Sequence, residues 1–545
     1  MAKIGLILAL AFGIVFHLYW QAGFPYTHDG ENHVARFADY AAAVRQGQLP
    51  PRIAPNIWSG VGYPVFIFNY PLSNILSLPL SAVNLPYTDS FKVLAVVYVL
   101  MGSVGIWLWL SYFLPQLASR PKLVGLLAWL SFPFLISTIY FRGNIGEIAA
   151  YGLLPWLFVG IELVKSKSKW SWLVVIAATA TFLLAHNISA VFVWPLALGY
   201  ALYRFKEKWL WWKLWLAPSA IGGLMTSWFW FPALFEKQFT VLDSASNNSA
   251  AVTHAPTIWQ LLSRPLRFGF SYPGTVDTLS FSLGITWLLL LVGIFIYFDK
   301  KTNNSIRTAL RFLIGATIVL IVLQVLPLAR VWNAPYLHFI QFPWRLSMFL
   351  GLPVAGLAAA VWQSANFPLR YVVATLMILS FWEVALLKPA DYVYKSSEDF
   401  ASFPHSTTTQ NENRPKTFVG LHGEVPPFAS IMSGQGVVRI DSWKGQEHRY
   451  EVSAQTTLVI TEATMYYPGW NVTAQNLETQ DIMSVPIDTK LHNGWLSYTL
   501  PSGNYAITSS FTENTWPRLG GDILSLMAVI GAVTIPTILG RRAKD

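Results

Sequence analysis

Long apolar stretches alternate with short polar loops along most of the chain. A helix needs about 20 mainly apolar residues to cross a bilayer, because each residue adds only about 1.5 Å. Stretches of roughly that length recur from one end of the chain to the other: 4–20, 91–115, 123–141, 148–164, 171–186, 188–203, 212–235, 279–298, 308–327, 346–363, 370–388 and 519–540. The pattern predicts a polytopic α-helical membrane protein with about twelve spans.

Two stretches depart from this pattern. Residues 65–85 are apolar but are interrupted by Pro71 and Pro79, which favours an interfacial or re-entrant segment over a span. Residues 389–518 contain no stretch long enough to cross. Polar and apolar positions alternate there, as in 449–453, and turn residues punctuate the alternation. Short antiparallel strands have this pattern, so we predict a β-sandwich before the last span.

Basic residues indicate how these parts are oriented. Lys and Arg gather in every second loop, at Lys3, Arg120, Lys122, Lys165, Lys167, Lys169, Arg204, Lys206, Lys208, Lys300, Lys301, Arg307, Arg370, Arg541, Arg542 and Lys544. Loops rich in Lys and Arg stay in the cytoplasm. We therefore predict cytoplasmic termini and a transmembrane domain 1–388 whose first outer loop is 21–90. An outer β-rich domain 389–518 follows, and then 519–545, the last span with a basic tail.

Composition narrows the classes of function. The chain is 54% hydrophobic and 12% charged, against about 25% charged in soluble domains, which excludes a soluble enzyme. The net charge of +10 does not indicate nucleic acid binding, because the basic residues lie in short loops that set topology. The absence of cysteine excludes disulfides, thiolate metal ligands and thiol nucleophiles. The sequence contains no nucleotide-binding glycine motif.

The first outer loop concentrates ionisable residues beside the membrane. His28, Asp29, Glu31, His33 and Arg36 follow directly after the first apolar stretch. A helix that starts at Asp29 and stops at Gly47 would place Asp29, His33 and Arg36 on one face, because residues three or four apart are neighbours on a helix. Ionisable groups at membrane depth are costly and are mostly retained for function, so we interpret this loop as a reaction centre.

These residue types suit transfer chemistry. A carboxylate at Asp29 can take a proton from an acceptor hydroxyl, while His33 and Arg36 can hold a lipid phosphate. A structural alternative stays open, in which Asp29 only caps the helix and Arg36 only reaches toward head groups.

Three further places carry polar residues at the predicted outer surface. Arg142 and Glu147 flank a glycine-containing turn between two spans, where they either pair with each other or bind a sugar or phosphate. His186 ends an apolar span and is either structural or a ligand-binding group. Arg345 opens a span on the outer side beside Trp344, against the usual charge bias, and either binds a phosphate or anchors the interface.

Together, these motifs resemble bacterial membrane proteins labelled 6-pyruvoyl-tetrahydropterin synthase-related, which are similar to the YfhO-like proteins. The segments that carry the resemblance are 28–33, 47–64, 142–147, 186–187, 341–345, 466–472 and 500–505. The label describes no pterin chemistry that these residues support. The group in turn resembles the GT-C superfamily of integral membrane glycosyltransferases, which use polyprenyl-phosphate sugars and carry an acidic residue in the first outer loop.

The resemblance implies an inverting glycosyltransferase in the bacterial cytoplasmic membrane, with its active site facing outward. Asp29 would be the base, with Glu31 as the competing candidate. Seven residues would bind substrate or phosphate: His28, His33, Arg36, Arg142, Glu147, His186 and Arg345. The donor would be a sugar on an undecaprenyl-type phosphate, and the acceptor a glycan, lipid or protein.

The reaction would require no cofactor or metal, although His28, Asp29, Glu31 and His33 also suit a divalent cation. Two rival functions remain open. One is a transporter or flippase, and the other is a non-enzymatic envelope assembly protein.

Overall fold

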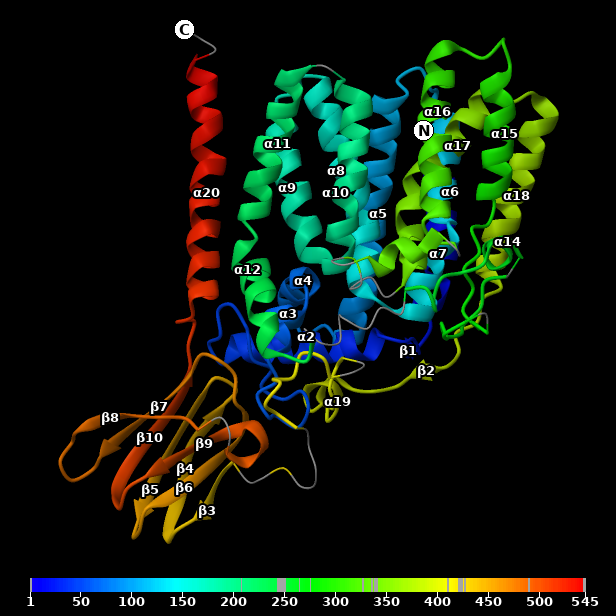
Figure 1. Ribbon diagram of the computed structural model, residues 1–545. Coiled ribbons are helices and arrows are strands. Elements are labelled where there is room, and N and C mark those ends of the chain that lie inside the picture. The colour runs from blue at the N-terminus through cyan, green and yellow to red at the C-terminus, as the bar shows by residue number, and fades with distance from the viewer. Residues whose placement is uncertain are drawn as a thin grey trace.

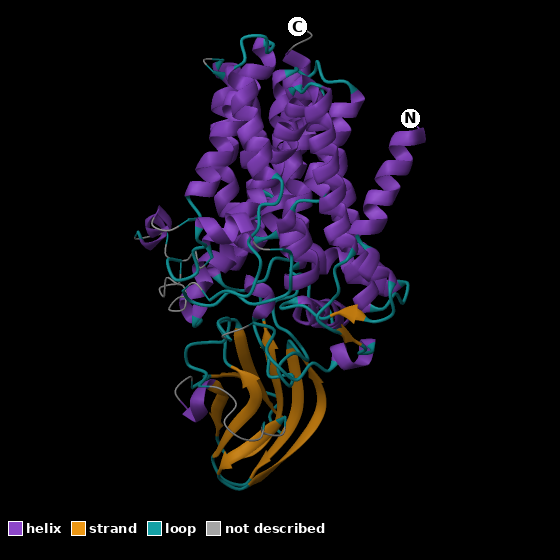
Figure 2. Cartoon of the chain, turned by 90° about the vertical axis from the view of Figure 1, so that its right-hand side faces the viewer, coloured by secondary structure: helices purple, strands orange, loops and turns teal. Residues whose placement is uncertain are grey.

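The computed structural model describes residues 2–206, 208–242, 251–263, 265–274, 276–325, 328–334, 337, 342–408, 411–419, 425, 428–488 and 491–542. Its described part consists of a bundle of helices with a β-rich domain at one end (Figure 1). Both termini lie at the opposite end of the bundle, away from the strands (Figure 2).

The bundle is built from the apolar stretches of the sequence. Its helices are α1 (Ala2–Val15), α5 (Tyr87–Phe113), α6 (Ser119–Leu130), α7 (Pro133–Ser137), α8 (Ile145–Lys165), α9 (Ser171–Ala185), α10 (Asn187–Phe205), α11 (Trp209–Leu224), α12 (Ser227–Glu236), α15 (Thr286–Phe298), α16 (Asn304–Val322), α17 (Ser347–Ser364), α18 (Phe367–Ala385) and α20 (Trp516–Arg542). Eight helical segments in the described part are long and apolar enough to cross a membrane. The helical membrane fold is thus confirmed, while the count of twelve spans stays a prediction.

One expected span is divided in the structure. Residues 212–235 form α11 and α12, which are separated by a break at Met225 and Thr226. Both helices contain a proline, Pro218 and Pro232, and a proline removes one backbone hydrogen bond from a helix interior. The break lets α12 run on to the end of the bundle where the β-rich domain attaches.

Helix α8 occupies the centre of the bundle. Within its most apolar window 94% of residues are buried, against 17% for α18. Its closest partner is α5, where a Cβ on Gly152 would lie 2.1 Å from the carbonyl oxygen of Tyr98. Small residues permit such close helix packing in membranes. The first turn of α8 is thereby fixed in the interior of the protein.

Short elements cover the end of the bundle next to the strands. They are β1 (Phe24–Pro25), α2 (Gly30–Arg45), α3 (Val65–Phe68), α4 (Leu72–Ala82), α14 (Ile258–Ser263), β2 (Tyr392–Val393) and α19 (Ser397–Ala401). Helix α2 lies across the bundle rather than along it (Figure 1). The 11 residues of α4 are too few to cross a bilayer, which agrees with the interpretation of 65–85 as a non-spanning segment.

The β-rich domain contains two antiparallel sheets. Its strands are β3 (Ala429–Ser433), β4 (Gly436–Lys444), β5 (Glu447–Ala454), β6 (Leu458–Met465), β7 (Trp470–Asn476), β8 (Ile482–Val485), β9 (Trp495–Leu500) and β10 (Gly503–Phe511). One sheet has the order β4-β5-β10-β7-β8 and the other β3-β6-β9. Val452 and Ile507 from the first sheet share a core with Ile460 and Leu500 from the second. The predicted β-rich region is therefore confirmed.

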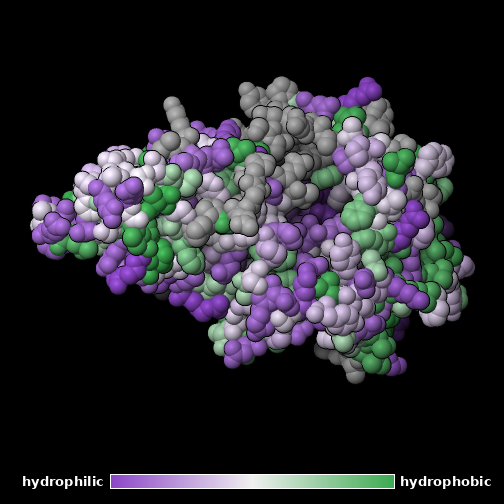
Figure 3. Space-filling view, turned by 90° about the horizontal axis from the view of Figure 1, so that it is seen from below, coloured by the Kyte–Doolittle hydropathy of each residue, from purple (hydrophilic) through white to green (hydrophobic). Residues whose placement is uncertain are grey.

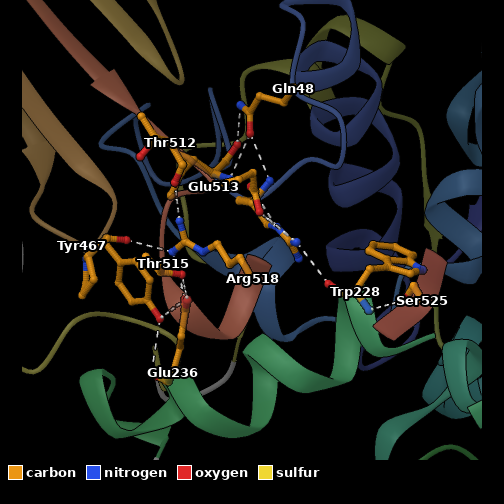
Figure 4. A network of polar contacts seen from close by, with 12 residues as sticks. Gln48, Trp228, Glu236, Tyr467, Thr512, Glu513, Thr515, Arg518 and Ser525 are labelled. Carbon is orange, nitrogen blue, oxygen red and sulfur yellow. Dashed lines mark hydrogen bonds and ion pairs between the residues drawn. The ribbon is translucent and has the colours of Figure 1, made fainter. Parts of the chain in front are cut away.

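One buried and one partly exposed ion pair join this domain to the bundle (Figure 4). Arg518 at the start of α20 lies 2.9 Å from Glu236 at the end of α12, and Tyr467 donates a hydrogen bond to the same carboxylate. Arg52 from the first outer loop lies 3.0 Å from Glu513, which follows β10. We call these five residues the Glu236 junction. It ties the first outer loop, two bundle helices and the β-rich domain together.

Candidate functional site

The first outer loop meets the start of α8 through backbone contacts. The N–H groups of His28 and Asp29 donate to the carbonyls of Phe141 and Arg142, at 3.0 and 2.8 Å. Gly143 has a φ of +60°, and a Cβ there would lie 2.0 Å from the hydroxyl of Thr27. Only glycine fits this approach without displacing the loop. The local geometry therefore holds Asp29 beside Arg142.

Asn144 links the two segments through its side chain. Its Oδ1 accepts from the N–H of Glu147 at 3.0 Å, which caps α8, and from the hydroxyl of Tyr70 at 3.0 Å. Its Nδ2 donates to Asp29 at 3.2 Å. A Cβ on Gly146 would lie 2.2 Å from the ring of Tyr70, so this glycine is what allows the ring to approach.

The structure corrects one expectation about Asp29. Helix α2 begins after Asp29 and ends before Gly47, as predicted, but the Asp29 side chain makes no capping hydrogen bond. The hydroxyl of Thr27 accepts from the N–H of Gly30 instead, at 3.1 Å. The Asp29 carboxylate turns to Asn144 and to Arg142, which lies 4.0 Å away, and its side chain is 32% exposed. Asp29 therefore does not cap α2, which is the structural role that the sequence suggested for it.

Four residues from separate parts of the sequence meet at the start of α8. Glu147 is fully buried and pairs with Arg142. It also lies 3.2 Å from Nε of Arg345 and 3.8 Å from Nε2 of His186. We call Arg142, Glu147, His186 and Arg345 the Glu147 cluster. The structure thus unites three constellations that the sequence had marked one by one.

Aromatic rings and hydrogen bonds hold the cluster in place. The guanidinium of Arg142 lies over the ring of Trp344 at 4.7 Å, and that of Arg345 lies over Phe342 at 4.9 Å. Nδ1 of His186 accepts from the N–H of Ser189 at 3.3 Å, which leaves Nε2 as the protonated nitrogen facing Glu147. The arginines are therefore oriented before any ligand arrives.

The cluster carries more positive than negative charge. Two guanidinium groups share the single carboxylate of Glu147, and Asp29 reaches only Arg142, at 4.0 Å. In the described part neither Nε of Arg345 nor Oε1 of Glu147 has a hydrogen bond, although they lie 3.2 Å apart. Buried charges are normally paired and hydrogen-bonded. The arrangement leaves capacity for an anion.

A second chain of polar contacts extends from the cluster to α2. The hydroxyl of Tyr70 lies 3.3 Å from Nε2 of His33, whose Nδ1 lies 3.4 Å from Arg36. Arg36 donates to the hydroxyl of Thr407 at 3.1 Å and to its carbonyl oxygen. Among the described residues no carboxylate lies within 4 Å of Arg36. This guanidinium is a further buried positive charge without an acidic partner.

His33 acts as a neutral hydrogen-bonding group in this chain. Burial, and then the charge of Arg36, lower the pKa of His33 well below its usual value. Tyr70 already donates to Asn144, so its oxygen accepts from Nε2–H of His33, and Nδ1 accepts from Arg36. Burial likewise raises the pKa of Tyr70. In these surroundings His33 would meet a phosphate as a neutral hydrogen-bonding group, and its role in binding one stays a prediction.

His28 and Glu31 border the cluster without joining it. Both line an open cleft of about 670 Å³, together with Thr27, Asn32 and Lys395. Glu31 pairs with Lys395. The ring of His28 stacks on Phe270 at 4.6 Å, and burial, followed by the charge of Arg142, lowers its pKa. The residues on either side of Asp29 thus open onto a cleft large enough for a sugar.

The four residues proposed as an alternative cation site do not converge. Asp29 contacts Asn144, Glu31 contacts Lys395, His28 stacks on Phe270 and His33 contacts Tyr70. Within the part of the chain that the structure describes, no group of three or more acidic or histidine side chains is arranged to hold a metal ion.

Some residues of the site were not singled out from sequence. Asn144 stands between glycines before a span, and its preference for helix starts was a usable signal. Tyr70 lies in the apolar segment 65–85, and Thr407 in the connection to the β-rich domain, where no local pattern marks them. Residues 338–341 of the motif that precedes Arg345 lie outside the described residues.

Comparisons with known proteins add a family. A sequence model described as "6-pyruvoyl-tetrahydropterin synthase related domain; membrane protein" matches residues 68–382. That range contains the Glu147 cluster but not Asp29. A protein of Lactococcus lactis subsp. cremoris (strain MG1363), described as uncharacterized, is 25% identical over 194 residues, which is 35% of this chain and 31% of that protein.

Two solved structures of the mycobacterial arabinofuranosyltransferase AftD are also similar. One has a TM-score of 0.44 at 14% identity and covers 70% of this chain and 26% of that enzyme. A mutant form has a TM-score of 0.43 at 15% identity and covers 72% and 29%. The chain therefore spans about a third of the length of the curated relative (31%) and a quarter to a third of the length of the enzyme (26% and 29%).

Proposed function

We propose that this chain, which belongs to the family of membrane proteins described as 6-pyruvoyl-tetrahydropterin synthase related, is an integral membrane glycosyltransferase. The donor is a sugar on a polyprenyl phosphate of the undecaprenyl type, and the acceptor is a glycan, lipid or protein outside the cytoplasm. One observation carries the proposal: the Glu147 cluster holds two largely buried, incompletely neutralised arginines, and one of them, Arg142, lies beside the partly exposed carboxylate of Asp29.

The arginines suit the phosphate of the donor. Guanidinium groups bind phosphate oxygens with two parallel hydrogen bonds. Arg142 and Arg345 are already held over aromatic rings and by Glu147, so little rotamer entropy is lost when the phosphate binds. Glu147 and His186 orient the arginines, and Arg36 adds positive charge nearby. Negative charge that develops on the leaving phosphate is stabilised by groups already in position.

Asp29 suits the role of the base. Its carboxylate takes the proton of an acceptor hydroxyl, and that oxygen attacks the anomeric carbon of the donor sugar. The bond from this carbon to the phosphate oxygen breaks, and the lipid phosphate leaves with the electron pair. A single displacement inverts the anomeric centre. Glu31 remains the alternative base, although its ion pair with Lys395 makes it the poorer candidate.

The membrane arrangement follows from the same proposal. All twelve apolar segments cross the bacterial cytoplasmic membrane, both termini are cytoplasmic, and the two sheets form a β-sandwich outside. The site then faces outward, where an energy-rich lipid donor is available without nucleotide. The reaction needs the membrane and the lipid donor but no nucleic acid and no cofactor.

Donor binding tests the proposal. The full protein in phosphatidylcholine nanodiscs is titrated with undecaprenyl phosphate and, in parallel, with undecaprenol, which lacks the phosphate. We expect saturable binding of the phosphate form and at least about tenfold weaker binding of the alcohol. Equal binding of both lipids would overturn the role of the arginines. Movement of the phosphate lipid across vesicles without sugar transfer would favour the flippase alternative.

A further inference from the structure

A second cleft, of about 570 Å³, lies between the first outer loop and the β-rich domain. One wall carries Gln46, Asn56 and Ser59 of the first outer loop, and the opposite wall carries Trp443, Lys444 and His448 around the β4–β5 hairpin. The view from the end of the molecule that carries the β-rich domain shows hydrophilic residues interspersed with hydrophobic ones (Figure 3). The cleft is separate from the Glu147 cluster.

Two hydrogen bonds fix the walls of this cleft relative to each other. The N–H of Gly445 donates to Oε1 of Gln46 at 2.8 Å, and the side-chain amide of Gln446 donates to the carbonyl oxygen of Gln46 at 2.8 Å. The Glu236 junction holds the same two parts from another side. The cleft is therefore a formed feature of the fold, as ligand sites usually are.

Aromatic rings provide its apolar surface. Trp443 stacks on His448 with ring centroids 3.7 Å apart and an angle of 6°, and Phe428 lies 5.2 Å from Trp443. Phe428 also lines the cleft, and the residue is 54% exposed. A large aromatic side chain left this exposed beside a cleft offers a flat face to a ligand.

The buried carboxylate of Glu462 orients the imidazole ring of His448. Nδ1 of His448 lies 2.5 Å from the buried carboxylate of Glu462, which also accepts from the hydroxyl of Tyr450 at 2.7 Å and from Ser509. In the described part, Nε2 has no hydrogen-bond partner. A carboxylate on one ring nitrogen fixes the tautomer and leaves the other available. His448 lines the cleft and, in the described part, keeps Nε2 without a partner, which makes Nε2 the ring nitrogen available to a ligand.

This combination of groups matches a saccharide. The C–H bonds of one sugar face pack on aromatic rings, and the hydroxyls need amide, hydroxyl and imidazole partners such as Asn56, Ser59 and His448. Among the described residues that line the cleft, only Lys444 carries a formal charge, so the cleft favours a neutral or anionic ligand. A cationic ligand would find no carboxylate among the described lining residues.

The two clefts share a residue. Ser402, directly after α19, lines both this cleft and the 670 Å³ cleft of His28 and Glu31. A ligand longer than one sugar can therefore lie in the 570 Å³ cleft and reach past Ser402 toward Asp29. A single sugar cannot occupy both.

We propose that the cleft between the first outer loop and the β4–β5 hairpin binds an extended neutral or anionic oligosaccharide, the acceptor of the transfer reaction. The far sugars rest on Phe428 and Trp443, and the chain passes Ser402 so that its end reaches Asp29. This inference rests on the proposed glycosyltransferase function for the identity of the acceptor. The binding site itself does not depend on catalysis.

Saccharide binding to the full protein in nanodiscs tests this inference. The probes are defined oligosaccharides of two to eight units built from hexoses, N-acetylhexosamines or uronic acids, and the measurement is the Kd by calorimetry. We expect the best series to bind at least about tenfold tighter as longer chains than as disaccharides. Phe428→Ala and Trp443→Ala should each weaken binding by about tenfold.

Controls separate the cleft from the rest of the molecule. Ile482→Ala removes another exposed apolar side chain of the β-rich domain, outside the cleft, and should leave the Kd unchanged. Asp29→Asn should bind the saccharide normally while failing in transfer. Should no series bind, or should Phe428→Ala and Trp443→Ala bind as wild type, the acceptor cleft is wrong. Undecaprenyl phosphate binding would then still report on the donor site by itself.

Discussion

Two groups of buried charges, the Glu147 cluster and the Glu236 junction, lie in the same protein but differ in charge balance. The junction matches Arg518 with Glu236, both buried, and Arg52 with Glu513, which is as exposed as Asp29 but lies only 3.0 Å from its arginine. In the Glu147 cluster two arginines face one buried carboxylate, and the second carboxylate, Asp29, is 4.0 Å away and partly exposed. Arg36 nearby adds a third positive charge, which contacts Thr407 and His33 but, among the described residues, no carboxylate.

The difference shows that buried ion pairs alone do not mark a functional site. A balanced pair that joins segments distant in sequence has a structural explanation, as in the junction. A cluster in which buried positive charges outnumber buried carboxylates costs free energy unless a ligand supplies negative charge. When a solvent-accessible carboxylate lies beside it, a functional site is the favoured explanation. The predictions below test whether the two groups differ as this comparison requires.

The largest effect is expected from removing the charge of each glutamate. Glu236→Gln leaves Arg518 without its partner and should destabilise the protein by about 3–5 kcal/mol, as does breaking other buried pairs. Glu147→Gln should also lower stability, because Arg142 and Arg345 then lose the carboxylate that they share. The apparent Tm of both variants in detergent measures the loss.

The response to ligand separates the two variants. Undecaprenyl phosphate supplies a negative charge to the Glu147 cluster and should raise the Tm of Glu147→Gln more than that of wild type, because binding to the folded state stabilises it. The same lipid should raise the Tm of Glu236→Gln only by as much as it raises the Tm of wild type. Equal shifts in both variants would remove the distinction drawn between the two groups.

Asp29→Asn should abolish most transfer while leaving the fold intact. Asn keeps the volume of Asp29 and an oxygen for the Asn144 contact, and no helix cap is lost because Asp29 does not cap α2. Transfer from a polyprenyl-phosphate sugar should fall by about a hundredfold or more, within the range of general-base effects. Glu31→Gln, measured in parallel, should have a mild effect. If Glu31→Gln abolished transfer and Asp29→Asn did not, the base would be Glu31.

The sequence predicted the large features of the fold because they depend on local patterns. Apolar runs marked the helices of the bundle, and alternation over 449–453 marked β5. The site was predicted in part. Arg142, Glu147, His186 and Arg345 stood out as polar groups at span ends, but their meeting depends on how the helices pack, which a single sequence does not contain. The roles of Tyr70 and Thr407 were missed for the same reason.

The misjudged cap shows a different limit of sequence reasoning. Asp29 has a favoured residue type for a helix start, and Thr27 does as well. Their order along the chain does not decide which side chain receives the N–H of Gly30. The approach of Gly143 and Asn144 from the start of α8 decides it, since Asn144 takes the Asp29 carboxylate. Contacts between segments distant in sequence thus override the local capping preference of Asp29, and its carboxylate remains available for chemistry.

The pKa of His33 gives a pH test of intermediate size. A histidine whose pKa in the folded state lies below the unfolded value near 6.5 binds fewer protons when folded, so its contribution to stability is present above pH 6.5 and is lost as the pH falls. By pH 5 this loss amounts to about 2 kcal/mol at most. We expect His33→Gln to lose less stability than wild type between pH 7 and pH 5 in chemical unfolding. Parallel losses would show that His33 is protonated in the folded protein.

The smallest effect is expected from replacing Arg345, measured as a change in lipid-phosphate affinity. This test addresses most directly whether the excess positive charge of the Glu147 cluster serves to bind a ligand. Arg345→Gln removes one of the two arginines that face Glu147, so charge within the cluster becomes balanced and the fold should remain stable. Undecaprenyl phosphate should bind about tenfold more weakly, which is about 1.4 kcal/mol. Arg345→Lys should recover part of the affinity, because lysine keeps the charge but loses the two-pronged hydrogen bond. Arg439→Gln, which alters an exposed arginine of β4, is the matched control and should bind as wild type. Unchanged affinity in Arg345→Gln would leave Arg345 as an anchor at the membrane interface, and the excess charge of the Glu147 cluster would then need another explanation.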